Sequence, residues 1–171
     1  MGRWEYVGVM MAYQRFPLPN VWLGVSVENQ RAADERIPEL LNTPAAVRWL
    51  SCEPLLEHVD LRLDEESLCG PGPDDSRRTR TGLRWVVVGG ESGSGARPTD
   101  IDWIRGIVQQ CQGARVPVFV KQLGARPVGL PPPESWRGLA RPDGRLRDRA
   151  GGNPAEWPAS LRVRQYPEVG R

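Results

Sequence analysis

The stretch Leu83-Arg-Trp-Val-Val-Val-Gly-Gly-Glu-Ser-Gly-Ser-Gly95 decides the fold class of this 171-residue chain. Its first half is rich in β-branched and aromatic residues, has the length of a strand and is apolar on both faces. Such a run is typical of a parallel strand that is buried on both sides, rather than of an antiparallel strand with one face in water. The glycines and the glutamate that follow mark the end of this strand.

Three further runs share these properties and are bounded by turn-forming residues: Val21–Val27, Val47–Cys52 and Val116–Val120. Helical patterns lie between the strands, at residues 29–42 and 99–113. This alternation of strands and helices predicts a parallel sheet with right-handed crossovers. We therefore expect an α/β fold with about four parallel strands and outer helices, either as a partial (β/α) barrel or as a small open sheet.

Local signals predict where the two helices begin, break and end. Pro38 falls inside the first helical pattern and is expected to split or kink that helix. Thr99 is expected to cap the start of the second helix, and Gly113 is expected to end it.

The last part of the chain has a different composition. From about residue 124 the hydrophobic periodicity fades and turn-forming residues become frequent. We assign residues 1–123 to the partial barrel and 124–171 to an irregular C-terminal extension rich in Gly, Pro and Arg. Trp136 and Trp157 are expected to anchor this extension to the domain.

Composition narrows the class of protein. The chain is 39% hydrophobic and 26% charged with a net charge of +2, which is ordinary for a globular protein. This charge is too small to indicate a nucleic-acid or membrane partner by bulk attraction. No apolar run reaches the roughly 18 residues of a membrane span, and the N-terminus lacks the pattern of a signal peptide, so we expect a cytoplasmic protein.

Polar residues follow each predicted strand. Glu28, Glu53 and Glu91 end the first three strands and Lys121 ends the fourth. The carboxyl ends of parallel strands meet at one edge of a sheet, where ligand sites are built. We therefore expect a cleft in which Lys121, a substrate amine or a metal balances the carboxylates. The alternative is that each glutamate only caps the helix that follows it.

The glycine-rich stretch fits no phosphate-binding template. It has neither the G-x-G-x-x-G nor the G-x-x-x-x-G-K-[ST] spacing. The backbone N–H groups of residues 93–96 with Arg97 give a weak anion-binding signal. Gly89 and Gly90 more simply allow the close approach of a ligand or of a neighbouring backbone.

The cysteines and the single histidine exclude several kinds of site. Cys52, Cys69 and Cys111 have no zinc-binding or cluster-binding spacing, and Cys52 and Cys111 fit an apolar core. His58 has no partner at ligand or triad spacing, which argues against Ser-His-Asp and zinc-hydrolase chemistry. We predict no metal site, although the three glutamates leave a hydrolase with oxygen-ligated metal as a minor alternative.

Three segments together resemble a known family. The residues "NVWLGVSVENQRAADERIPELLNTPAAVRWLSCEPLLEHVDL", "WVVVGGESGSGARP" and "VPVFVKQLG" look like the C-terminal half of the phage-associated three-Cys-motif family. This is a domain family of unknown function that is similar to radical S-adenosylmethionine enzymes. The resemblance covers residues 20–122 and implies a partial (β/α) barrel.

The resemblance also implies roles for the strand-end residues. Ser26 and Glu28, with Gly89 and Gly90, would contact the cofactor. Catalytic roles would fall to Glu53, Glu91 and Lys121 in the cofactor and substrate cleft.

The chain departs from this family in its cysteines. Full-length members are expected to bind S-adenosylmethionine and a [4Fe–4S] cluster through a cysteine-rich loop, and none of the three cysteines here matches that loop. We therefore expect no cofactor in this chain and a truncated form, inactive alone. It would associate with a missing N-terminal half, with itself or with a partner protein. The alternative is a non-catalytic binding or assembly module that uses the acidic cleft.

Overall fold

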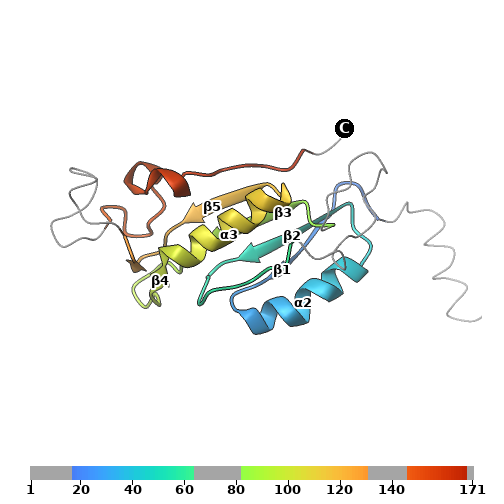
Figure 1. The fold of residues 1–171 in the computed structure, drawn as a ribbon, viewed down its shortest axis with the longest axis horizontal. Helices are drawn as coiled ribbons and strands as arrows, with labels where there is room; N and C mark the ends of the chain where they lie inside the picture. The colour runs from blue at the N-terminus through green and yellow to red at the C-terminus, as the bar shows by residue number, and fades with distance from the viewer. Residues whose placement is uncertain (1–16, 64–81, 131–145, 169–171) are drawn as a thin grey trace, which may run out of the picture.

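A computed structural model describes residues 17–63, 82–130 and 146–168 of the chain. Its centre is a four-stranded parallel sheet of β1 (Trp22–Ser26), β2 (Val47–Cys52), β3 (Trp85–Gly89) and β5 (Val118–Gln122), in the order β1-β2-β3-β5. The predicted α/β fold with about four parallel strands is therefore confirmed (Figure 1). The barrel remains a prediction.

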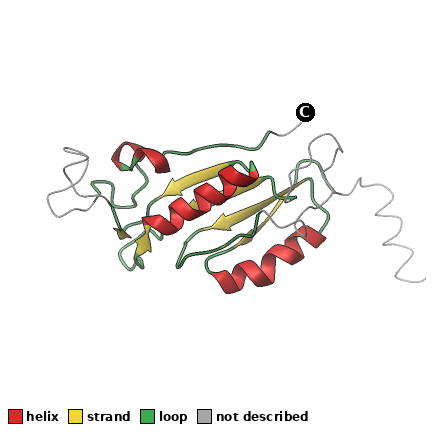
Figure 2. Cartoon of the chain, viewed as in Figure 1, coloured by secondary structure: helices red, strands yellow, loops and turns green. Residues whose placement is uncertain are grey.

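Two helices connect these strands and cover one face of the sheet. Helix α2 (Gln30–Asn42) follows β1, and α3 (Ile101–Ala114) lies between β3 and β5 (Figure 2). Their buried side chains, such as Ile37 and Ile104, belong to one apolar cluster with Leu50, Val86 and Val118 of the strands. Alternate strand residues point to the opposite face of the sheet, which neither helix covers.

The helix ends differ from the sequence predictions. Asp100 caps α3 by accepting from the backbone N–H of Asp102, so the prediction that Thr99 caps this helix is wrong. Thr99 instead lies in the short strand β4 (Thr99–Asp100), which pairs with β6 (Pro127–Val128). The prediction for Gly113 is also wrong, because α3 continues to Ala114.

The residue that ends α3 is Arg115, which has φ 58° and ψ 34°. Its backbone N–H bonds back to the carbonyls of Cys111 and Gln112. A glycine usually takes this left-handed position at the end of a helix, because it has no Cβ. The residue type at position 115 therefore gave no indication that the helix ends there.

Helix α2 runs unbroken through Pro38, so the expectation of a split helix is wrong. Proline removes only its own N–H from the helix hydrogen bonds, here the one toward Asp34. Asn29 caps the helix start through the backbone N–H of Ala32, and Ile37 and Leu40 are buried in the core. Apolar packing of this face outweighs the local cost of the proline.

The C-terminal segment is irregular, as expected, and packs on the sheet. It contains two short 3₁₀ helices, η3 (Pro154–Glu156) and η4 (Ala159–Leu161), and Leu161 of η4 joins the main core. Trp157 is 2% exposed and donates its indole N–H to the Gly151 carbonyl, which confirms it as an anchor. The division at residues 123/124 stays a prediction, and Trp136 and Cys69 lie outside the described residues.

The same segment covers one edge of the sheet. Val120 donates its backbone N–H to the Val163 carbonyl, and Gln165 donates to the Val118 carbonyl. This antiparallel pairing protects the outer side of β5 (Figure 1). The C-terminal segment therefore occupies the hydrogen-bonding groups on the outer side of β5.

Candidate functional site

The strand ends bring together one of the predicted pairs. Lys121 Nζ lies 3.0 Å from Glu53 Oε2. Glu53 follows β2 and Lys121 lies in β5, so the pair spans the end of β3 between them. The Glu53 side chain is only 15% exposed whereas that of Lys121 is 56% exposed, so the pair joins a largely buried carboxylate to an accessible amine.

Lys121 is also distinctive in composition. It is the only lysine in a chain that contains 23 basic residues, of which the other 22 are arginines. The ammonium group of lysine is a compact charge with three rotatable donors, unlike the planar guanidinium. One donor of Lys121 serves Glu53, and the exposed head leaves room for a second acceptor.

Glu28 binds an arginine of the following helix rather than the other glutamates. Arg36 Nη1 lies 2.9 Å from Glu28 Oε2 and also donates to the Ser26 carbonyl at 2.8 Å. This contact ties α2 to the end of β1. Sequence reasoning missed Arg36, although a basic residue two turns into the next helix was the available signal.

Glu91 folds back on its own loop. Its carboxylate accepts the backbone N–H of Arg97 at 2.9 Å and both Nε and Nη2 of the Arg97 guanidinium, at 2.7 and 3.0 Å. These bonds, to the side chain first and then to the backbone, lower the pKa of Glu91 from 4.5 to about 2. The arginine that suggested an anion site therefore binds a carboxylate of the protein itself.

The three glutamates do not form a single metal-binding group. Each has a different cationic partner, and no cluster of three or more His, Cys, Asp or Glu side chains in the described segments has the arrangement of a metal site. Glu53 and Lys121 therefore form the centre of the candidate site.

The two glycines at the end of β3 accommodate neighbouring backbone. A Cβ on Gly89 would lie 3.0 Å from the Gln122 carbonyl oxygen, and one on Gly90 would collide with the Leu123 carbonyl. Gln122 also donates its side-chain amide to the Gly90 carbonyl at 2.8 Å. Of the two explanations that the sequence allowed, the structure supplies contacts for close backbone approach. Cofactor binding by these glycines stays a prediction.

Ser26, predicted to contact the cofactor, is exposed at the end of β1. Its neighbour across the sheet is Ser51 of β2. Both residues occupy the face that the helices do not cover, on the same side as Glu53. Two hydroxyl groups therefore lie along the sheet face that leads toward the ion pair.

The two described cysteines are core residues, as predicted. Cys52 and Cys111 are both buried, and burial raises the pKa of each thiol, to about 12 for Cys111. Metal clusters are bound by thiolates, which neither residue readily forms in this environment. Neither fits the role of a cluster ligand.

Comparison with known proteins identifies a family and no function. No curated protein and no solved structure matches the chain. None of the helices in the described segments is both long and apolar enough to cross a membrane. Residues 3–150, most of the chain, match the family described as protein of unknown function DUF5131, and the protein belongs to this family.

Proposed function

We propose that the strand-end edge binds S-adenosylmethionine, and that the chain is the C-terminal half of a radical S-adenosylmethionine-like enzyme of phage or prophage type. The observation that carries this proposal is the Glu53–Lys121 pair over the end of β3. Its carboxylate matches the α-amine of the ligand, and its ammonium matches the α-carboxylate. Ligand binding would replace one internal ion pair with two intermolecular ones.

The topology supports this proposal. Four parallel strands in sequential order, with both helices on one face, are what a section of a (β/α) barrel requires. The face without helices would then line the interior of the barrel. Ser26, Ser51 and Glu53 lie along this face toward the edge where barrel enzymes hold their ligands.

The chain's own residues support binding and not cleavage of the cofactor. S-adenosylmethionine cleavage in radical enzymes needs an electron from a thiolate-bound cluster, and the buried thiols Cys52 and Cys111 do not fit that group. We propose that this chain positions the cofactor and is inactive alone. Its catalytic partner would be a missing N-terminal half, a second copy or another protein.

One observation favours a second candidate function, a non-catalytic binding or assembly module. Glu28, Glu53 and Glu91 each contact a cation and so tie neighbouring segments together. An edge organised in this way recognises a small cationic or zwitterionic ligand without chemistry. The two functions differ in whether chemistry follows binding at these residues.

Calorimetric titration with S-adenosylmethionine tests the first proposal. We expect saturable binding that weakens about tenfold in Glu53→Gln and in Lys121→Met, which is the loss of one charge-assisted contact of about 1.4 kcal/mol. Arg31→Gln is the matched control, because Arg31 is exposed on α2 and pairs with Glu35 of the same helix. Absence of binding to the wild-type chain would overturn the proposal.

The single lysine allows a second, site-specific measurement. Reductive ¹³C-methylation labels only Lys121 and the N-terminal amine, so the Lys121 signal is resolved in NMR spectra. We expect this signal to shift on addition of S-adenosylmethionine but not of adenosine, which lacks the amino-acid part. Equal shifts with both would contradict the role of the ion pair.

A further inference from the structure

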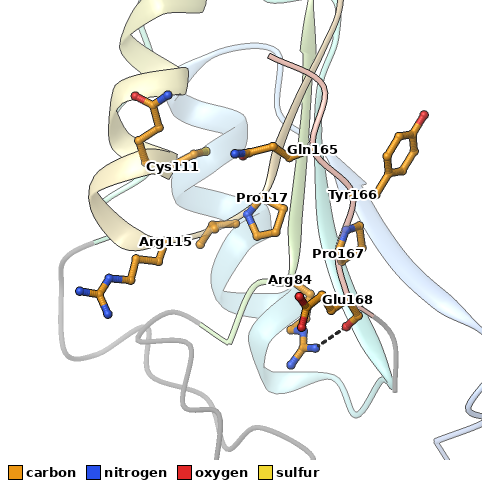
Figure 3. A pocket seen from close by; sticks show the side chains of 10 residues that line it. Arg84, Cys111, Arg115, Pro117, Gln165, Tyr166, Pro167 and Glu168 are labelled. Atoms are coloured by element: carbon orange, nitrogen blue, oxygen red, sulfur yellow. Dashed lines mark hydrogen bonds between the residues drawn. The ribbon is translucent and has the colours of Figure 1, made fainter. Parts of the chain in front are cut away.

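A pocket lies at the N-terminal ends of the parallel strands, whereas the candidate site lies at their C-terminal ends. It has a volume of about 490 Å³ and lies where β3 and β5 begin (Figure 3). Arg84 precedes β3, Arg115 ends α3, Pro117 precedes β5, and residues 165–168 of the C-terminal segment close the other side. Three separate stretches of the chain therefore build this pocket: Arg84, residues 111–117 and residues 165–168.

The polar groups of the pocket are mainly donors. Arg84 donates Nη2 to the Glu168 carbonyl at 2.9 Å, and within residues 17–63, 82–130 and 146–168 its Nε and Nη1 donate to no acceptor. The Gln165 side chain accepts the Val118 backbone N–H at 3.1 Å, which fixes its amide and leaves the Nε2 donors for another acceptor. With two arginines against the single carboxylate of Glu168, the lining has a net positive charge.

Arg115 adds a second cation to the lining of the pocket. Its guanidinium makes no ion pair or side-chain hydrogen bond among the described residues, and its backbone holds the left-handed position that favours glycine. Figure 3 shows it on one side of Pro117, with Arg84 and Glu168 below that proline. A long, unengaged arginine at the rim can reach a ligand held by Arg84.

The remaining walls are apolar. Val116, Pro117 and Pro167 line the pocket, together with Cys111 of α3. Tyr166, which is 66% exposed, adds an aromatic ring at the rim. Ligand pockets commonly combine such apolar walls with a few polar groups that fix orientation.

We propose that this pocket binds a small organic anion, in which a carboxylate or phosphate group meets Arg84 and Arg115 and an apolar body packs on Pro117 and Pro167. The shared chemistry is a planar or tetrahedral anion attached to an apolar group. This site is independent of the Glu53–Lys121 pair, since it shares no residue with it and lies at the other ends of the strands.

Binding of phenyl phosphate and of benzoate, followed by NMR and calorimetry, tests the proposal and separates the two anion types. We expect at least one of them to perturb the backbone signals of residues 115–117 and 165–167. Inorganic phosphate should bind more weakly because it lacks the apolar body, and benzylamine should not bind. Equal affinity for inorganic phosphate and phenyl phosphate, or binding of benzylamine, would overturn the assignment.

Arg115→Gly is the decisive variant, because glycine suits the left-handed backbone there and the fold should remain intact. We expect it to weaken anion binding about tenfold, the equivalent of one charge-assisted hydrogen bond. Arg31→Gln removes the same charge from an exposed site outside the pocket and should leave the affinity unchanged. Equal weakening in both variants would show a general charge effect and contradict a built site.

Glu168→Gln provides a test in the opposite direction. Removing the one carboxylate of the lining should tighten anion binding, while the backbone carbonyl that Arg84 contacts remains. Weaker binding in this variant would overturn the charge argument.

Discussion

Glu91 illustrates how a single carboxylate closes a glycine-rich loop. Three bonds reach it from Arg97, one from the backbone and two from the guanidinium. Bidentate pairs of this kind are among the stronger polar contacts in proteins. The Glu91 carboxylate therefore occupies the donors of Arg97, for which the composition of the loop had suggested a bound anion from solution.

The Glu91 contact predicts a pH dependence. Its pKa in the folded protein is about 2, below the ordinary 4.5, so its contribution to stability is complete above about pH 4.5 and is lost as the pH falls toward 2. An NMR titration of the Glu91 side-chain carboxyl should show this low midpoint. In Arg97→Gln the midpoint should rise toward the ordinary value. An unchanged midpoint in that variant would contradict the assigned cause.

Arg115 predicts an unusual order of stability among substitutions. The left-handed backbone at this position destabilises a residue with a Cβ by about 1–2 kcal/mol. The positive charge of Arg115 near the C-terminal end of the helix stabilises it by about 0.3–1 kcal/mol. Arg115→Gly removes both effects, whereas Arg115→Ala removes only the favourable one. We expect the glycine variant to exceed the alanine variant by about 1 kcal/mol in free energy of unfolding, measured by urea denaturation. Equal stability, or a more stable alanine variant, would contradict the cap geometry.

Residue-level partners were the hardest feature to predict from the sequence. The glutamates at the strand ends follow from strand order, because parallel strands place their ends together. Their partners depend on side-chain reach, which for Arg36 and Arg97 spans eight and six positions in the chain. Only Lys121, itself at a strand end, was predictable as a partner.

At the scale of elements, the close contact between β3 and the segment after β5 depends on Gly90. Its backbone bonds to Gln122, and the Leu123 carbonyl occupies the space of a side chain. The strand and its neighbour can meet in this way only without a Cβ. The glycine pair is therefore part of the sheet as well as of the loop.

Gly90→Ala should destabilise the protein by about 1–3 kcal/mol, the usual cost of overpacking a buried position. Gly95→Ala is the matched control in the same loop, because a Cβ there would meet nothing within 4 Å. We expect its effect to stay within about 0.5 kcal/mol. Thermal and urea unfolding of the two variants measure the difference, and similar losses in both would contradict the packing explanation.

Elements were predictable from sequence where their pattern was strong. The four apolar runs became the four strands, and β2 has the predicted limits Val47–Cys52. Predictions of helix boundaries were wrong where local sequence signals opposed packing. At Pro38, for example, the burial of one face of α2 outweighs the destabilising effect of the proline. The predicted end of α3 was wrong because an arginine in the left-handed conformation cannot be recognised from its residue type.

At the scale of the whole molecule, the C-terminal segment completes the core. Trp157 and Leu161 lie in the same apolar cluster as the central strands. Arg164 stacks over the rings of both Phe119 and Trp157, at 5.2 and 5.3 Å. Sequence patterns missed this role because the segment has no periodicity and its contacts are distant along the chain.

Trp157→Ala should lower the free energy of unfolding by about 3–5 kcal/mol, since it empties a buried position and removes the indole hydrogen bond to the Gly151 carbonyl. Val128→Thr is a control at an apolar residue that is 44% exposed, and should change stability by less than about 0.5 kcal/mol. Chemical denaturation distinguishes the two. A loss below 1 kcal/mol for Trp157→Ala would show that the segment is dispensable to the fold.

The pairing of the C-terminal segment with β5 makes the two edges of the sheet different. One side is already sealed by residues 163–165, whereas β1 stands last in the strand order of the described residues. The strand Trp22-Leu-Gly-Val-Ser26 contains no charged residue and no proline, which are the residues that commonly discourage pairing with another strand. If a further strand joins this sheet, we therefore expect it to pair with β1 and not with β5, whose outer side residues 163–165 already occupy.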